Sequence, residues 1–151
     1  IASKIQLMEI SQFSDYALRV LIFSGLEAER CSVPEIAKAH NISHHHLVKV
    51  VHHLAKAGFL QTFRGRGGGF QLAKDPGTFT VAEVLRSTEN LALVECLPPR
   101  EGTCCLSGCC VLKGAILKAR HAFLAVLDGY TLKDLLLPRS ALREALALSP
   151  E

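Results

Sequence analysis

Apolar positions along the chain recur at two spacings, which predict where helices and strands lie. From Ser14 they recur every three or four residues, the spacing of a helix that buries one face. Two short apolar runs on either side of a glycine-rich turn instead predict a β-hairpin. One predicted helix begins after Ser14, and the other predicted helices span 32–39, 43–57, 80–88, about 110–128 and 131–134. The predicted strands span 59–63 and 70–73.

Capping signals support these limits. Ser32 with Glu35, and Thr80 with Glu83, have the spacing of a capping box, in which two side chains satisfy free amides at a helix start. Gly58 follows the third helix, where glycine adopts the left-handed conformation that ends a helix.

The order of these elements predicts a mainly α-helical fold with one small β-hairpin. A helix, a helix–turn–helix pair and a hairpin follow one another in a winged helix–turn–helix domain, which binds DNA through its second paired helix. We expect residues 1–7 to be a remnant outside the natural chain, which would start at Met8. The expected parts are then the winged domain at 8–75, a connecting helix at 76–95, a cysteine-rich loop at 96–110, a dimerisation helix and short terminal helix at 110–137, and a peripheral tail at 138–151.

The long C-terminal helix carries a narrow apolar stripe. Its spacing of four and then three residues is typical of a helix that pairs with another helix. In a chain of 151 residues we expect the partner to be the same helix of a second copy, so the stripe predicts a homodimer. The stripe consists of Leu112, Ile116, Ala119, Phe123 and Leu127.

Composition excludes two broad classes of protein. With 49% hydrophobic and 21% charged residues, the chain is not intrinsically disordered. No apolar run approaches the ~18 residues of a membrane span, and the first residues lack the layout of a secretory signal. We therefore expect a cytoplasmic protein without a membrane partner.

Charge is unevenly distributed along the chain. The net charge is +3, but between Ile36 and Lys74 there is no acidic residue, while six Lys or Arg and six of the seven histidines lie there. Contacts to phosphate favour Lys and Arg and disfavour Asp and Glu. The distribution predicts that this half of the chain binds double-stranded DNA.

Candidate DNA contacts lie at the start of the predicted recognition helix and in the hairpin turn. Histidine donates to or accepts from a base edge, lysine suits phosphate or guanine, and arginine is attracted to a narrow minor groove. A nucleotide-binding loop is excluded, because a strand rather than a helix follows the glycines. The candidate contacts are Ser43, His44, His45, Lys49, Arg64, Gly65 and Arg66, with His46 less favoured.

Five of the six cysteines fall within fifteen residues. Their spacings do not fit the paired ligands of a structural zinc site, whereas loops rich in Pro and Gly suit an iron–sulfur cluster. Unmetallated thiols that form a disulfide switch are the alternative. A thiol-redox enzyme using Cys104 or Cys109 is disfavoured, because no Cys-x-x-Cys motif is present. The clustered residues are Cys96, Cys104, Cys105, Cys109 and Cys110, and Cys31 stands apart as a structural thiol.

Several stretches together resemble the Rrf2 family of bacterial transcription regulators. They are the opening 8–19, the turn and strand 64–73, the helix after Thr80, the cysteine loop with 111–113, and the segment 123–132. The last two most resemble the nitric-oxide-sensing repressors of that family. The resemblance covers nearly all of residues 8–136.

The resemblance implies a dimeric repressor, not an enzyme, that reads a palindromic operator and holds an iron–sulfur cluster with Cys96, Cys104 and Cys110. In some nitric-oxide sensors a carboxylate near the start of the first helix, from the partner subunit, completes a [4Fe–4S] site. Asp15 has that position, although a helix-start charge would also explain it. Cys105 and Cys109 depart from the pattern, and either could substitute as a ligand.

The cluster type and the mode of sensing have alternatives within the same family. A second branch, the regulators of iron–sulfur biogenesis, has a histidine three residues after its last cysteine and holds [2Fe–2S]. Lys113 stands there in this chain, which favours [4Fe–4S]. A cluster lost during aerobic purification, and a regulator that works through thiols or another effector without a cluster, both stay open.

Overall fold

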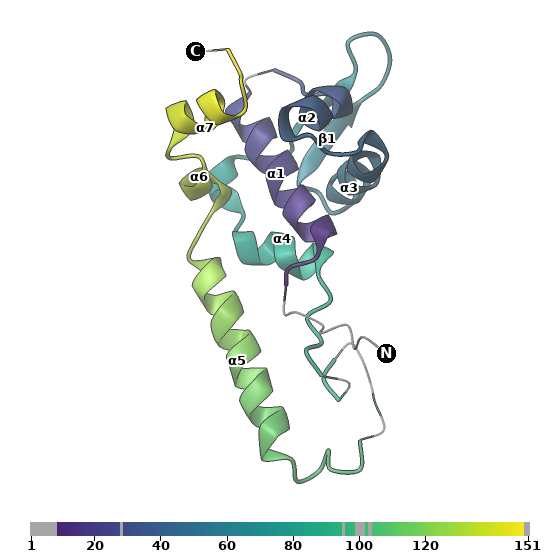
Figure 1. Ribbon diagram of the computed structural model, residues 1–151, viewed down its shortest axis with the longest axis vertical. Coiled ribbons are helices and arrows are strands. Elements are labelled where there is room, and N and C mark those ends of the chain that lie inside the picture. The colour runs from purple at the N-terminus through teal and green to yellow at the C-terminus, as the bar shows by residue number, and fades with distance from the viewer. Residues whose placement is uncertain (1–8, 28, 95, 99–101, 103, 150–151) are drawn as a thin grey trace, which may run out of the picture.

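The molecule consists of a helical head from which one long helix projects. The computed structural model describes residues 9–27, 29–94, 96–98, 102 and 104–149, and Figure 1 shows the head at the top and the helix α5 below it. The helices are α1 (Gln12–Leu26), α2 (Val33–His40), α3 (His44–Lys56), α4 (Val81–Thr88), α5 (Val111–Asp128), α6 (Leu132–Leu135) and α7 (Arg139–Ala145), with a 3₁₀ turn at Pro76–Thr78.

Helix α1 forms the centre of the head. Its N-cap is Ser11, whose side chain accepts a hydrogen bond from the Ser14 amide at 3.2 Å. Ala17, Val20 and Leu21 are fully buried, because α3, α4 and the hairpin all pack around this helix. The core of the protein therefore lies in the head, where residues of α4 and α6 complete it, and it determines how the DNA-facing elements are oriented.

Helices α2 and α3 form the helix–turn–helix. Glu35 closes the predicted capping box by accepting from the amide and hydroxyl of Ser32, both at 2.6 Å. Asn41 ends α2 in the left-handed conformation at φ 52°, which turns the chain sharply into α3. The predicted limits of both helices are confirmed to within about one residue.

The hairpin consists of β1 (Leu60–Phe63) and β2 (Gly69–Leu72), paired antiparallel from Leu60 opposite Leu72 to Phe63 opposite Gly69. Cys31 extends the sheet, because its amide and carbonyl bond to Phe70 at 2.8 and 2.9 Å. The hairpin is thus joined to the segment between α1 and α2. A mainly helical fold with one small hairpin, arranged as a winged helix–turn–helix, confirms the predicted fold class.

Helix α4 connects the head to α5. Its predicted capping box is present, with the Thr80 amide donating to Glu83 at 2.8 Å. Arg86 forms a bidentate ion pair with Asp128, at 2.8 and 2.5 Å, which joins α4 to the end of α5. This is the end of α5 nearest the head.

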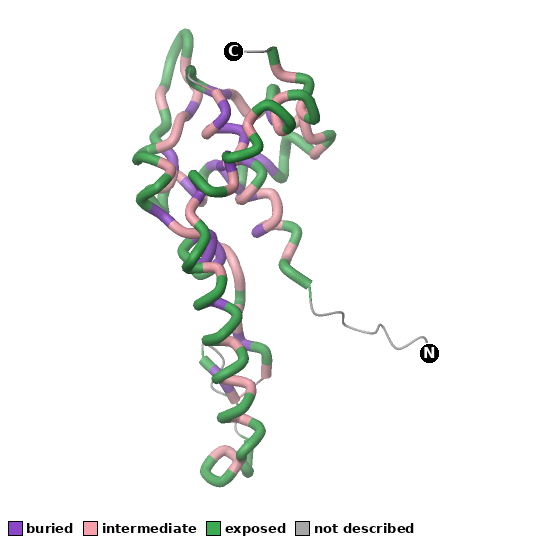
Figure 2. The backbone as a smooth tube through the Cα atoms, turned by 90° about the vertical axis from the view of Figure 1, so that its left-hand side faces the viewer, coloured by how far each residue is buried: buried purple, intermediate pink, exposed green. Residues whose placement is uncertain are grey.

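Most of α5 is exposed in the single chain. Figure 2 shows the helix as mainly green, and Leu124 is the buried residue among those described on it. Leu112 is 64% exposed and Phe123 39%, so these two residues of the predicted apolar stripe are uncovered, and Val126 beside the stripe is 63% exposed. An uncovered apolar stripe of this length is typical of a helix that pairs with another chain.

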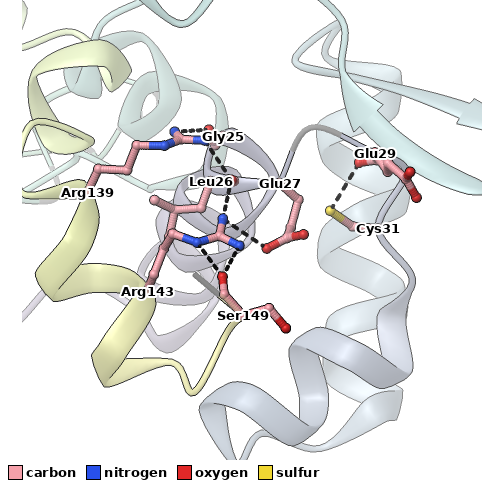
Figure 3. A network of polar contacts seen from close by, with 8 residues as sticks. All are labelled: Gly25, Leu26, Glu27, Glu29, Cys31, Arg139, Arg143 and Ser149. Atoms are coloured by element: carbon pink, nitrogen blue, oxygen red, sulfur yellow. Dashed lines mark hydrogen bonds and ion pairs between the residues drawn. The ribbon is translucent and has the colours of Figure 1, made fainter. Parts of the chain in front are cut away.

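The residues after Pro138, expected to be a peripheral tail, instead form α7 and pack against the head. Arg139 donates to the carbonyls of Gly25 and Leu26, and Arg143 donates to Leu26 at 2.7 Å (Figure 3). These carbonyls belong to the last turn of α1, where no amide within the helix can satisfy them. Leu142, Leu146 and Leu148 pack against the same core.

No helix in the described part of the chain is both long and apolar enough to cross a membrane.

Candidate functional site

The recognition helix α3 presents two different faces. Leu47, Val50 and Leu54 are buried against the head, so the helix is held rigidly. The opposite face is exposed and has no acidic side chain. It carries the predicted contacts Ser43, His44, His45 and Lys49, and also His46, His52 and Lys56.

Val48 lies on the exposed face of α3 and was not among the predicted contacts. It is 44% exposed, between His45 and Lys49. An exposed apolar side chain on a recognition helix suits the methyl group of thymine. The signal available in the sequence was its position, one turn after His44 and His45.

Three histidines, His46 of the exposed face among them, contact rings of the head. His53 lies edge-on to Phe13 with ring centroids 5.4 Å apart, and His46 lies 6.4 Å from Tyr16. His40 packs near Phe23, and burial, with Arg19 adding to it, lowers its pKa. The histidine-rich composition therefore serves the head as well as the exposed face of α3.

The turn of the hairpin, residues 64–68, projects from the head. Arg64, Gly65 and Arg66 are exposed at its tip, as the wing interpretation expects. Gly65 and Gly67 have φ of +90° and +72°, values that side chains other than glycine rarely adopt. The glycines therefore form the tight turn that separates the two guanidinium groups from the sheet.

Cys96 lies in a turn beside α5. The Leu97 amide donates to the Val94 carbonyl at 3.1 Å, and Leu97 itself is buried. Arg120 of α5 donates to the carbonyl of Pro98 at 3.0 Å and to that of Leu91 at 3.4 Å. Two backbone carbonyls on either side of Cys96 are thus fixed to α5.

The other four clustered cysteines lie at or just before the N-terminus of α5. Cys110 is the N-cap of the helix, and its sulfur accepts from the Lys113 amide at 3.4 Å. Cys104, Cys105 and Cys109 are exposed in the turn before it. A thiolate at a helix N-terminus is favourably placed, because the free amides there stabilise negative charge.

The described residues contain no group of three or more His, Cys, Asp or Glu that could hold a metal ion. The thiols of Cys96, Cys104 and Cys110 are all free and suit iron in their chemistry. The chain as folded here does not gather them.

Asp15, the predicted oxygen ligand, lies on the exposed side of α1. Its carboxylate accepts from Arg19 at 2.9 Å, and both side chains are close to half exposed. The single chain does not bring Asp15 into a metal-ligating group. Asp15 as a ligand supplied across the subunit interface stays a prediction.

A buried polar contact joins the start of α1 to the end of α4. Glu89 accepts from the amide of Ser11 at 2.9 Å and from the hydroxyl of Ser14 at 2.7 Å. Burial alone would raise the pKa of Glu89, but these hydrogen bonds together hold it below its ordinary value. The carboxylate is seven residues before Cys96, so the contact fixes where the cysteine loop leaves the head.

Cys31 is a structural thiol within the head. It is 2% exposed, and burial raises its pKa to about 11. A thiol with so high a pKa is a poor nucleophile and metal ligand, because the thiolate is the reactive form. The distinction between Cys31 and the clustered cysteines agrees with the sequence interpretation.

Comparison with known proteins agrees with this arrangement. The chain is 46% identical over 142 residues to the HTH-type transcriptional regulator NsrR of Geobacillus kaustophilus, covering 92% of this chain and 97% of that protein. It is 42% identical to the regulator of the same name from Shouchella clausii, covering 92% and 95%. The structure of the global cysteine regulator CymR of B. subtilis is similar, with a TM-score of 0.67, 29% identity, and coverage of 85% of this chain and 96% of that one.

The family described as Rrf2, iron-dependent transcriptional regulators, matches residues 10–138. These residues include α1 to α6, the hairpin and the cysteine loop. The chain therefore belongs to the Rrf2 family of transcriptional regulators.

Proposed function

We propose that the protein is a homodimeric, nitric-oxide-responsive repressor that binds a palindromic operator and holds an iron–sulfur cluster through Cys96, Cys104 and Cys110. The observation that carries the proposal is the position of the thiols. Cys96 is fixed beside α5 by Arg120, and Cys110 caps the start of the same helix. Helix α5 thus connects both ends of the cysteine loop, Cys96 and Cys110, to the DNA-binding head.

The head supplies the DNA contacts. In each subunit α3 enters a major groove, with His45, Val48 and Lys49 facing the bases or phosphates, and the hairpin turn places Arg64 and Arg66 along the backbone or in the minor groove. Two such heads, related by the two-fold axis of a dimer, match a palindromic site. The uncovered apolar stripe of α5 supports pairing between two copies.

In this proposal three thiolates of one subunit would hold the cluster, and the partner subunit's Asp15 would complete a [4Fe–4S] site. When bound, it supplies iron that reacts with nitric oxide. Lys113, which replaces the histidine of the [2Fe–2S] branch, donates from its ammonium to Ser107 at 2.8 Å. A protonated amine is not a metal ligand, so this observation supports the oxygen-completed site.

Occupancy of the ligand loop changes DNA binding through contacts that the chain already makes. Glu89 ties the first turn of α1, which contains Asp15, to the segment leading to Cys96. Helix α1 in turn packs against α3 and the hairpin. Without the link between subunits that Asp15 would provide, the two heads would shift, a change that requires only a few kcal/mol.

Anaerobic reconstitution with iron and sulfide tests the proposal. We expect a brown protein whose visible absorption is absent when Cys96, Cys104 and Cys110 are replaced by Ser. The matched control replaces Cys105 and Cys109 by Ser and keeps the absorption. A duplex selected by the reconstituted protein from a random-sequence library is then titrated before and after a nitric oxide donor, which should lower the affinity.

A cluster-free regulator is the second candidate, and one observation favours it: the described cysteines are not gathered round a common centre. Under that alternative the reconstituted protein stays colourless and binds the selected duplex equally well with and without the donor. A cluster that persists in the variant lacking Cys96, Cys104 and Cys110 would contradict the ligand assignment.

A further inference from the structure

Arg30, in the connection between α1 and α2, lies against the hairpin turn. Its guanidinium carbon is 3.7 Å from the centroid of the Phe63 ring, which is the geometry of a cation–π contact. Its Nη1 also donates to the carbonyl of Gly67 at 3.1 Å. One side chain from outside the hairpin therefore makes two separate contacts to it.

The two contacts are on opposite legs of the turn. Phe63 is the last residue of β1, and Gly67 precedes β2 by one residue. Between them lies a tight turn closed by the hydrogen bond from the Gly68 amide to the Gly65 carbonyl at 2.9 Å. Arg30 thus connects the outgoing and returning legs just below the tip that carries Arg64 and Arg66.

The backbone next to Arg30 is itself fixed to the sheet. Cys31 makes two backbone hydrogen bonds to Phe70, and the segment passes so close to Gly69 that a Cβ there would lie 2.5 Å from the Cys31 carbonyl oxygen. The position of Arg30 relative to the hairpin is therefore determined by the fold. The guanidinium therefore reaches the turn by its side-chain conformation alone, without any movement of the backbone.

A turn that contains three glycines gains conformational freedom unless something outside it restricts the backbone. Two arginines on a mobile turn bind DNA more weakly than two arginines on an ordered turn, because ordering the turn on binding costs entropy. The planar guanidinium of Arg30 stacks on a ring and donates a hydrogen bond at the same time, which a lysine ammonium matches poorly. The contacts of Arg30 therefore order the wing before DNA arrives.

We propose that Arg30 is a positioning residue for the wing, which acts on DNA through the orientation of Arg64 and Arg66 and not through a phosphate contact of its own. This inference rests on the proposed binding of DNA by the head. It assigns a role to a residue that lies outside both the recognition helix and the wing.

The experiment compares Arg30→Gln in two backgrounds, the wild-type wing and a wing with Arg64→Ala and Arg66→Ala. The probe is a duplex selected by the wild-type protein from a random-sequence library. Because Arg30 acts through the two arginines, Arg30→Gln weakens binding about tenfold in the first background and less than about twofold in the second. Arg30→Lys is expected to be intermediate, and Lys133→Gln, an equal change of charge on α6, is the matched control.

Two results would overturn the inference. Equal weakening in both backgrounds, with a slope of log affinity against log salt smaller by about 0.9, shows that Arg30 contacts a phosphate directly. Unchanged binding in both backgrounds shows that Arg30 has no role. The thermal midpoint should be unchanged in each variant, since Arg30 is exposed.

Hydrogen exchange of the free protein gives a readout that needs no DNA. Arg30→Gln is expected to speed exchange of the Gly68 amide, while the amide of Phe70, bonded to Cys31, exchanges as before. Equal exchange at Gly68 in both proteins overturns the inference even if the wild-type protein selects no duplex. Failure to select a duplex, by contrast, contradicts the proposed function itself.

Discussion

The side chain of Leu136 lies directly over Gly25. A Cβ atom added at Gly25 would stand 2.5 Å from a methyl group of Leu136, closer than packed atoms approach. Gly25 belongs to α1 and Leu136 follows α6, so this contact brings the C-terminal part of the chain close to the last turn of the central helix. Glycine is required here by space and not by backbone conformation.

Gly25→Ala is therefore expected to destabilise the protein by about 1–3 kcal/mol, because the added methyl displaces Leu136. Gly114→Ala on α5 is the matched control, since nothing lies within 4 Å of its Cβ position. Alanine favours a helix over glycine, so this control should gain about 0.5–1 kcal/mol. Urea unfolding measures both, and a stabilised Gly25→Ala variant would contradict the packing described.

Arg143→Ala is expected to lower the free energy of unfolding by about 1–3 kcal/mol, because a charged donor to the Leu26 carbonyl is lost. Its side chain is 12% exposed and also pairs with Glu27 at 3.3 Å. Glu144→Ala, an exposed neighbour on α7, is the control. If both variants unfold at the same urea concentration as the parent, α7 contributes nothing to the stability of the head.

Glu89 makes stability depend on pH in the acid range. The pKa of Glu89 is lower in the folded protein than the ordinary value of 4.5, so its contribution is fully present above that pH and is lost as the pH falls through the folded value. Glu89→Gln should destabilise the protein at pH 7, and the difference from the parent should shrink below about pH 4.5. A difference that is constant with pH would rule out the ionised carboxylate as the cause.

Lys49 and His45 are expected to affect DNA binding in different ways. Lys49→Ala should weaken binding to all duplexes alike and reduce the salt slope by about 0.9, as for one lost phosphate contact. His45→Ala should relax the preference at one base pair by about 1–3 kcal/mol. Titrations of the selected duplex and its single-base variants separate the two, with Lys133→Ala as the control. Identical behaviour of both variants would contradict the proposed orientation of α3.

Element limits in the head could be predicted because their signals are local. The capping boxes at Ser32 and Thr80 and the glycine after α3 each act within a few residues, and each appears where the pattern placed it. The DNA-contact and cluster-ligand assignments rest on patterns alone and stay predictions.

The packing of α7 could not be predicted in the same way. Its helix is seven residues long and starts after Pro138 without a capping side chain. What holds it is the contact of Arg139 and Arg143 with carbonyls more than a hundred residues earlier, a tertiary interaction without a local signal. The arrangement of the clustered cysteines could not be predicted from the sequence for a related reason, since spacing along the chain does not say which sulfurs approach one another.

The buried thiol of Cys31 and the exposed thiols of the cysteine loop lie in different parts of the molecule and differ in reactivity. Burial raises the pKa of the Cys31 thiol to about 11, which slows its reaction with oxidants and alkylating reagents at neutral pH, while Cys104, Cys105 and Cys109 are exposed to solvent. Oxidants at neutral pH therefore modify the exposed sulfurs before the thiol inside the head.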